Sequence, residues 1–203
     1  APASKSTDHE PRGYFMRLVT FSDTNGTRIG VHDAASNTIV DLAATTRLPK
    51  DMTGFIALGK NGLKRARAAV KSGAGRLPFA SVRLHAPIPR PAKNILCVGK
   101  NYYDHAHEFH ASGVDASAGK DAIPELPIMF TKWPNSVIAS NEPIPSYLDY
   151  TNSTDYEGEL AVVIGPGGRG ITKKNAFDYI YGYTIINDAS ARTLQKEHRQ
   201  WFL

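Results

Sequence analysis

Two glutamates, Glu157 and Glu159, stand in front of the apolar segment 160–164, LAVVI. A run rich in β-branched residues favours a β-strand, and alternate residues of a strand point to the same face. The two carboxylates are therefore expected side by side, where they repel unless a cation lies between them or one keeps its proton. A third carboxylate, Asp188, follows the strand-like segment 181–187. If the two strand ends are neighbours, three oxygen ligands converge, which suits Mg²⁺, Mn²⁺ or Ca²⁺ better than zinc.

The same spacing also has a simpler interpretation. A Glu-x-Glu pair on a strand is most often a solvated face, because charged side chains are mostly exposed. The residue types and their spacing therefore leave a metal site and an exposed surface both open.

A histidine and a glutamate three positions apart, His105 and Glu108, could supply acid–base chemistry. On a helical turn this spacing places both side chains on one face, so the carboxylate can orient the imidazole as a general base. A surface hydrogen bond is the alternative. His107 and His110 lie close by, so composition alone does not choose among the three histidines.

The elements that must position these groups fall into two parts. Residues 1–15 are polar and without periodicity, which predicts a flexible leader. Residues 16–90 form a small N-terminal domain: three short strands as a meander with an Asn25-Gly26 hairpin turn, then helices near 54–58 and 62–70. Alternating prolines in 83–91 exclude a central strand and predict an extended connector. Residues 91–203 are the second domain.

Within the second domain, the segment 113–127 is rich in turn residues and is expected to belong to a loop. The segment 172–181 is expected to form a short helix, with Thr172 as its cap.

Composition indicates an ordinary soluble protein. Hydrophobic residues make up 41% of the 203 residues and charged residues 21%. No apolar run is long enough for a membrane span or a secretory signal, so no membrane partner is expected. The single cysteine, Cys97, fits a reducing compartment, either the cytoplasm or the mitochondrial matrix. Its apolar surroundings favour a buried small side chain over a nucleophile.

The net charge of +5 raises the question of nucleic acid. The basic residues cluster on one helix-like stretch whose other face is apolar, so a solvated amphipathic helix explains them. No aromatic residues are interleaved with them, as single-strand binding would require. Nucleic acid is therefore not expected as a partner. The cluster comprises Lys60, Lys64, Arg65, Arg67 and Lys71.

Several ordered motifs resemble the catalytic domain of the fumarylacetoacetate hydrolase superfamily. They are the segment 155–160, DYEGEL, the segment 186–195, INDASARTLQ, and the Gly-x-Asn-Tyr-x-x-His-x-x-Glu string in 99–108. The resemblance extends from about Asn94 to Leu203. It is specific to the superfamily and unspecific about the substrate.

The resemblance implies a role for each matching residue. Glu157, Glu159 and Asp188 would bind a catalytic Mg²⁺ or Mn²⁺. His105 and Glu108 would be a catalytic dyad on a mobile lid that continues through 113–127. Three further residues would contact the substrate or brace the site, and for Lys132 a structural ion pair is an equal alternative: Lys132, Arg192 and Gln195.

The implied activity is metal-dependent cleavage of a small 2-oxo or β-diketo carboxylic acid. Hydrolysis of a C–C bond, as in acylpyruvate hydrolases, and decarboxylation, as with oxaloacetate, would both proceed through a metal-bound enolate, and isomerases of the superfamily share this chemistry. Family members are commonly homodimers. A non-catalytic structural metal-binding or assembly module is the alternative function.

The implied fold is α+β and β-rich, with a β-meander and helix domain followed by a mixed β-roll. In the family the corresponding domain continues beyond the point that matches Leu203. The catalytic domain is therefore expected to be incomplete at its C-terminus, leaving strand edges and apolar surface open.

Overall fold

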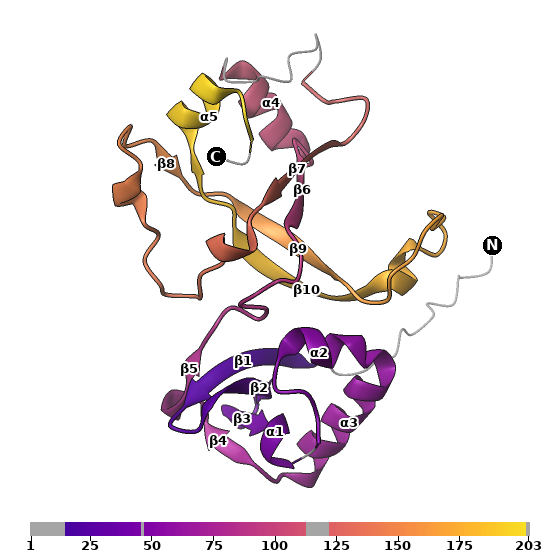
Figure 1. Ribbon diagram of the computed structural model, residues 1–203. Helices are drawn as coiled ribbons and strands as arrows, with labels where there is room; N and C mark the ends of the chain where they lie inside the picture. Colours follow the sequence, from indigo (N-terminus) through magenta and orange to yellow (C-terminus); the bar gives the residue numbers. More distant parts are fainter. Residues whose placement is uncertain (1–14, 46, 113–121, 202–203) are drawn as a thin grey trace, which may run out of the picture.

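The computed structural model describes residues 15–45, 47–112 and 122–201. Two parts follow one another along the chain (Figure 1). The first is a strand meander with helices, and the second contains short strands and two α-helices. The protein is thus α+β and rich in strands, as predicted. The predicted leader, except residue 15, and most of the predicted loop at 113–127 lie outside the described residues.

The first part is built on a five-stranded antiparallel sheet in the order β4-β3-β2-β1-β5. The hairpin between β1 and β2 forms where Asn25-Gly26 predicts it, with Asp23 opposite Gly26 and Gly26 at φ +94°. The strands are β1 (Arg17–Asp23), β2 (Gly26–Asp33), β3 (Thr38–Asp41), β4 (Arg76–Pro78) and β5 (Arg83–Leu84).

Three helices contribute to this sheet's core: α1 (Leu42–Thr45), α2 (Met52–Ala57) and α3 (Gly59–Ser72). Asp51 begins α2 by accepting a hydrogen bond from the Gly54 amide, and Gly73, at φ +71°, ends α3. The helices bury Phe55, Ala66 and Ala69 against Ile29, Val31 and Val40.

A buried arginine ties this domain together. Arg28 binds Asp41 through Nε at 2.6 Å and Asp23 through both terminal nitrogens at 2.7 Å, and its Cζ lies 4.5 Å from the Phe21 ring centre. Asp41 in turn accepts hydrogen bonds from the Ala43 and Ala44 amides at the start of α1. One guanidinium therefore joins the hairpin, β3 and α1.

The second part begins with β6 (Ile95–Gly99), α4 (Tyr103–Ala111) and β7 (Ile128–Lys132), followed by the short 3₁₀ turns η2 (Pro134–Ser136) and η3 (Ser146–Leu148). Then come β8 (Thr154–Asp155), β9 (Gly158–Ile164), η4 (Ala176–Tyr179), β10 (Ile180–Asn187), β11 (Ser190–Ala191) and α5 (Arg192–His198).

These strands pair as β6-β7, β9-β10 and β8-β11. All three pairings are antiparallel, so within the described ranges the predicted mixed β-roll is present only as separate two-stranded sheets. The predicted helix at 172–181 is wrong. The chain forms only the η4 turn there, and β10 begins at Ile180 because its residues pair with β9.

One face of β9 and β10 is apolar and open. The exposed residues alternate along both strands, and cross-strand partners such as Leu160 and Ile185, or Val162 and Tyr183, share that side. Ile185 is 81% exposed and Ile164 60%. This side of the strand pair is therefore an exposed apolar surface.

The two parts meet through the connector and through one tyrosine. The connector's Arg83 forms an exposed ion pair with Glu142 at 2.6 Å. Tyr181 of β10 packs against the core of the first part, and its hydroxyl is buried without a hydrogen-bond partner within the described residues.

No helix among the described residues has the length and apolarity to cross a membrane.

The Arg28 cluster predicts acid-sensitive stability. The hydrogen bonds from Arg28 lower the pKa of Asp23 from 3.8 to about 2. The stabilisation is fully present above the ordinary pKa and is lost as the pH falls through 4 toward 2. Arg28→Met should lower the free energy of unfolding by about 3 kcal/mol at neutral pH, because it removes the guanidinium that neutralises the buried Asp41. It should also flatten stability between pH 4 and 2, measured by urea unfolding.

Adding Asp41→Asn to Arg28→Met is the matched control. The amide removes the carboxylate charge that Arg28 no longer neutralises, and its oxygen still accepts the α1 amide bonds, so part of the lost stability should return. An Arg28→Met variant as stable as the wild type would contradict the account.

The buried Tyr181 hydroxyl gives a second prediction. Burial raises its pKa to about 12, as expected for a phenol without a partner. Tyr181→Phe removes this unsatisfied group and keeps the ring, so unfolding should cost roughly 1 kcal/mol more. Tyr183→Phe is the control, since Tyr183 lies on the same strand and is 56% exposed. Destabilisation by Tyr181→Phe in urea unfolding would show that the hydroxyl has a partner.

Candidate active site

The three predicted acidic residues lie on neighbouring segments. In the β9-β10 pair, Glu159 stands opposite Ile186 and Gly158 opposite Asn187. The pairing continues one residue further, where the Asp188 amide donates to the Glu157 carbonyl at 2.8 Å. The two strand ends are therefore neighbours, which was the condition for bringing the three carboxylates together, and Glu157 lies just before β9 rather than on it.

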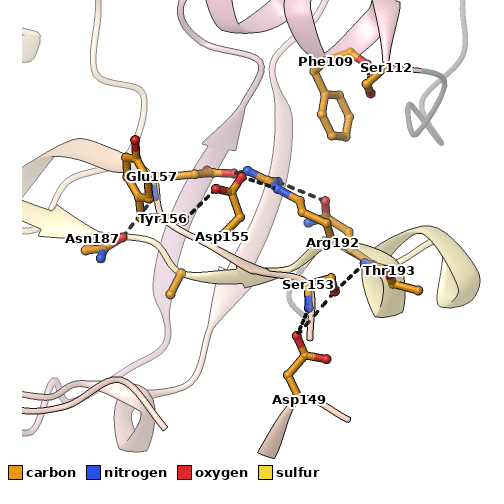
Figure 2. A network of polar contacts seen from close by, with 12 residues as sticks. Phe109, Ser112, Asp149, Ser153, Asp155, Tyr156, Glu157, Asn187, Arg192 and Thr193 are labelled. Atoms are coloured by element: carbon orange, nitrogen blue, oxygen red, sulfur yellow. Dashed lines mark hydrogen bonds and ion pairs between the residues drawn. The ribbon is translucent and has the colours of Figure 1, made fainter. Parts of the chain in front are cut away.

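Arg192, at the start of α5, neutralises one side of this acidic group (Figure 2). Its Nε lies 2.9 Å from Asp155 Oδ2, and one terminal nitrogen donates to Glu157. The other donates to the Gln195 amide oxygen at 3.2 Å. Desolvation lowers the pKa of Arg192, but the bonds to Asp155 and Glu157 outweigh it and raise the pKa. The predicted bracing role of Arg192 fits this geometry.

Lys132, at the end of β7, neutralises the other side. Its Nζ lies 3.0 Å from Asp188 Oδ1, with both side chains mostly buried, and it donates to the Ala189 carbonyl at 3.3 Å. Of the two roles considered for Lys132, the structure contains the ion pair.

Burial, and then the charge of Asp188, raise the pKa of the nearby Cys97 thiol to about 11. The thiol is therefore protonated at neutral pH, which disfavours a nucleophile.

Glu159 has no cation within ion-pairing distance in the described part of the chain. Burial, and then repulsion from Glu157, raise its pKa, while a hydrogen bond from the Tyr102 hydroxyl lowers it. Repulsion from Asp188 adds to the rise. Glu159 is thus a carboxylate whose charge is poorly compensated.

The acidic group as a whole has four carboxylates and two cations, because Asp155 joins the three predicted residues. All the donors are carboxylate oxygens, which hard cations prefer. Within 15–45, 47–112 and 122–201, no three His, Cys, Asp or Glu side chains are grouped closely enough to hold a metal. The donor chemistry fits a divalent cation, while Arg192 and Lys132 are paired with three of the four carboxylates, Asp155, Glu157 and Asp188.

The start of α5 is fixed by a polar turn. Asp149 accepts hydrogen bonds from the amides of Thr151 and Ser153. Bonds led by that of the Thr151 hydroxyl lower the pKa of Asp149 to about 2. The Ser153 hydroxyl accepts from the Thr193 amide, and the Ser153 carbonyl accepts from the Arg192 amide. Figure 2 shows how this turn holds Arg192 beside Glu157.

A cavity opens beside the acidic group. It brings together the predicted His105, Glu157, Arg192 and Gln195, the last of these 6% exposed. Gly99, Lys100, Phe109, Phe130, Ser190 and Trp201 complete the lining.

The predicted dyad is only partly assembled. His105 and Glu108 both lie on α4, but Glu108 is exposed and does not line the cavity. No hydrogen bond joins the two side chains among the described contacts. The imidazole lies instead beside Phe109, with ring centres 5.9 Å apart. The expected orienting bond is therefore not seen: His105 lines the cavity, whereas Glu108 is exposed.

Two parts of the site were missed by the sequence reasoning. Asp155 alternates with Glu157 and Glu159, so the same period of two could have placed it on the acidic face. Lys100 and the aromatic wall of Phe109, Phe130 and Trp201 come from separate elements. No local pattern could have joined them.

Comparisons with known proteins agree on one family. The sequence profile described as "Fumarylacetoacetate (FAA) hydrolase C-terminal" matches residues 94–203. The oxaloacetate tautomerase YisK of Bacillus subtilis is 50% identical over 125 residues, covering 62% of this chain and 39% of that protein. The mitochondrial oxaloacetate tautomerase fahd2 of Xenopus laevis is 36% identical over 193 residues, covering 93% and 57%.

Solved structures show the same relationship. A fumarylacetoacetate hydrolase from Exiguobacterium antarcticum superposes with a TM-score of 0.69 at 36% identity, covering 93% of this chain and 61% of that one. The maleylpyruvate hydrolase of Sphingobium sp. SYK-6, in complex with manganese(II) and pyruvate, gives 0.63 at 26% identity, covering 87% and 60%. The chain spans roughly two to three fifths of the length of these relatives.

The raised pKa of Glu159 predicts that its negative charge destabilises the protein without a metal and helps to bind Mg²⁺. In EDTA, Glu159→Gln should raise the melting temperature of the full-length protein by about 1–3 °C, because it relieves repulsion at a partly exposed site. Mg²⁺ at about 100 times its Kd should stabilise the wild type by about 2.7 kcal/mol. The variant should lose most of this response. Glu108→Gln, on exposed α4 surface, should change neither value, and a full Mg²⁺ response in Glu159→Gln would remove Glu159 from the ligand set.

Proposed function

The chain belongs to the fumarylacetoacetate hydrolase family, and we propose that it acts on small 2-oxo carboxylic acids by forming their enols. Its relatives with named activities are enzymes, among them tautomerases of oxaloacetate, a maleylpyruvate hydrolase and isomerases. The observation that carries the proposal is one cavity lined by His105, Glu157, Arg192 and Gln195. An imidazole there stands beside carboxylates, whose oxygens are the donors that hard cations prefer.

Glu157, Glu159 and Asp188 would hold the divalent cation, Mg²⁺ or Mn²⁺. When bound, it would polarise the substrate's carbonyl and stabilise negative charge on the oxygen. The poorly compensated Glu159 supports this assignment, because a divalent cation relieves the repulsion that raises its pKa. Lys132 and Arg192 would then serve as the counter-charges that keep the ligands in place without the metal.

The reaction is a proton transfer at carbon. His105 removes a proton from the carbon next to the carbonyl, and the electron pair of that C–H bond becomes the C=C bond of the enol. Delivery of a proton to the carbonyl oxygen completes tautomerisation. Gln195 would donate an amide N–H to a substrate oxygen, and Arg192 would keep Gln195 oriented through the bond to its amide oxygen.

We propose tautomerisation as the reaction, ahead of hydrolysis and decarboxylation. Relatives at 33–50% identity are named oxaloacetate tautomerases. The hydrolysis and decarboxylation expected from the motifs involve the same kind of enol or enolate. Decarboxylation forms it by loss of CO₂, and hydrolysis requires water to attack a second carbonyl. Each breaks a C–C bond, whereas tautomerisation needs only proton transfers.

The domain assignment and assembly belong to the same proposal. Residues 16–90 would act as an accessory domain and 91–203 as part of the catalytic domain, with the enzyme a homodimer. Tyr181, which packs from the second part against the core of the first, supports their acting together.

His105 is the direct test of the proposed chemistry. His105→Ala should lower the rate of oxaloacetate tautomerisation at least about 100-fold, because general-base catalysis typically contributes this much. Mg²⁺ affinity, measured by calorimetry, should change by less than about twofold. The measurement is the enol absorbance of oxaloacetate, with the full-length protein.

His107→Ala is the matched control, because His107 is exposed on the same helix and does not line the cavity. Equal rates for His105→Ala and the wild type would remove the general-base role. Metal-dependent stabilisation without turnover of any 2-oxo acid would favour the alternative, a structural metal-binding module.

A further inference from the structure

The position of His105 needs a support that its predicted partner does not supply. A general base must lie within hydrogen-bond reach of the proton it removes, and a loosely supported group loses much of its effect. Glu108 is exposed and does not bond the imidazole among the described contacts. The side chains that α4 buries are Ala106 and Phe109, at 1% and 9% exposure. The packing that supports His105 is therefore on the apolar side of α4.

Three aromatic rings connect this side of α4 to the β6-β7 sheet. The Phe109 ring lies beside the His105 imidazole, with ring centres 5.9 Å apart. Phe109 also meets the Trp201 ring edge to face, at 5.7 Å and an angle of 81° between the rings. Trp201 in turn meets Phe130 of β7, at 5.9 Å and 78°. Pairs of this geometry are each worth about 2- to 10-fold in an equilibrium. Trp201 is common to both edge-to-face pairs, so it joins α4 to β7.

Gly99, at the end of β6, provides the space for the indole. A Cβ at this position would lie 1.9 Å from Trp201 Cζ3 and 2.5 Å from Cε3. The Gly99 backbone is outside the left-handed region, so glycine is needed here for space rather than for conformation. Glycine within a strand often marks such a close approach. The indole therefore packs directly on the β6 backbone, and two strands fix its position.

We propose that Trp201 is a positioning residue for the reaction. Its indole fixes Phe109, and through Phe109 it keeps the His105 imidazole at the cavity. This inference rests on the proposed function, because it takes His105 as the general base. Arg192, in the same short segment, pairs with the carboxylates. The segment 192–201 therefore positions both the acidic group and the base.

Two substitutions test this role in different ways, with the full-length protein and the enol absorbance of oxaloacetate. Trp201→Ala removes the indole, whereas Gly99→Ala displaces it and removes no side chain. Each should lower kcat about 10- to 100-fold, because small displacements of a reacting group can cost this much. Each should change KM less than about threefold. Trp201→Phe keeps a ring and should recover part of the loss.

Double substitutions show whether the loss acts through His105. In the His105→Ala background, Trp201→Ala should change the residual metal-dependent rate less than about twofold. In the Trp201→Ala background, Gly99→Ala should likewise have little effect, since its Cβ no longer meets an indole. A fully additive loss with His105→Ala, or a KM change as large as the kcat change, would indicate general stability or substrate contact and overturn the inference. Trp133→Phe is the control, since Trp133 is 60% exposed, and it should leave kcat unchanged.

Amide hydrogen exchange tests the packing without any turnover. In Trp201→Ala and Gly99→Ala, peptides from α4 should exchange at least about 10-fold faster, because aromatic pairs that hold this helix are lost. Peptides from β1, β2 and β3 should keep their wild-type rates, which would show that the variants are folded. Unchanged exchange in α4, or equal acceleration in both regions, would overturn the inference. Absence of turnover by the wild type would reject the proposed function, and exchange would then decide whether Trp201 holds α4.

Discussion

Repulsion among carboxylates is the constraint around which the second half of this protein is arranged. Asp155, Glu157 and Glu159 alternate along one segment, and Asp188 joins them because β10 pairs with β9. Such a group is stable only with positive charge nearby. The chain supplies Arg192 from α5 and Lys132 from β7, and Glu159 remains with a raised pKa. A divalent cation would complete the compensation.

In the N-terminal domain, by contrast, the buried charge of Arg28 is fully compensated by carboxylates. Arg28 is matched by Asp23 and Asp41 with short bonds, and Asp41 also starts a helix, so that the network is satisfied. Satisfied buried networks hold one arrangement, whereas partly compensated groups are typical of functional sites. The contrast within one chain supports placing the chemistry at the acidic group and a structural role at Arg28.

Features set by neighbours in the sequence were predictable. The period of two in Glu157 and Glu159, the Asn25-Gly26 hairpin and the amphipathic α3 all depend on local geometry, and all are present. Features set by pairing across the chain were not. Ile180 and Tyr181 suit a short helix locally, yet pairing with β9 draws them into β10. The ion pair of Lys132 with Asp188 joins residues 56 positions apart, and no pattern in either segment indicates it.

The central claim is that this cavity promotes enol formation by a divalent cation and a base together. It is tested most directly by NMR of oxaloacetate in D₂O with the full-length wild-type protein, following deuterium incorporation at C3 above the uncatalysed rate. The account predicts rapid incorporation with Mg²⁺ or Mn²⁺ and none above background in EDTA. Incorporation that is unaffected by EDTA, or that stays at background with either metal, would contradict it.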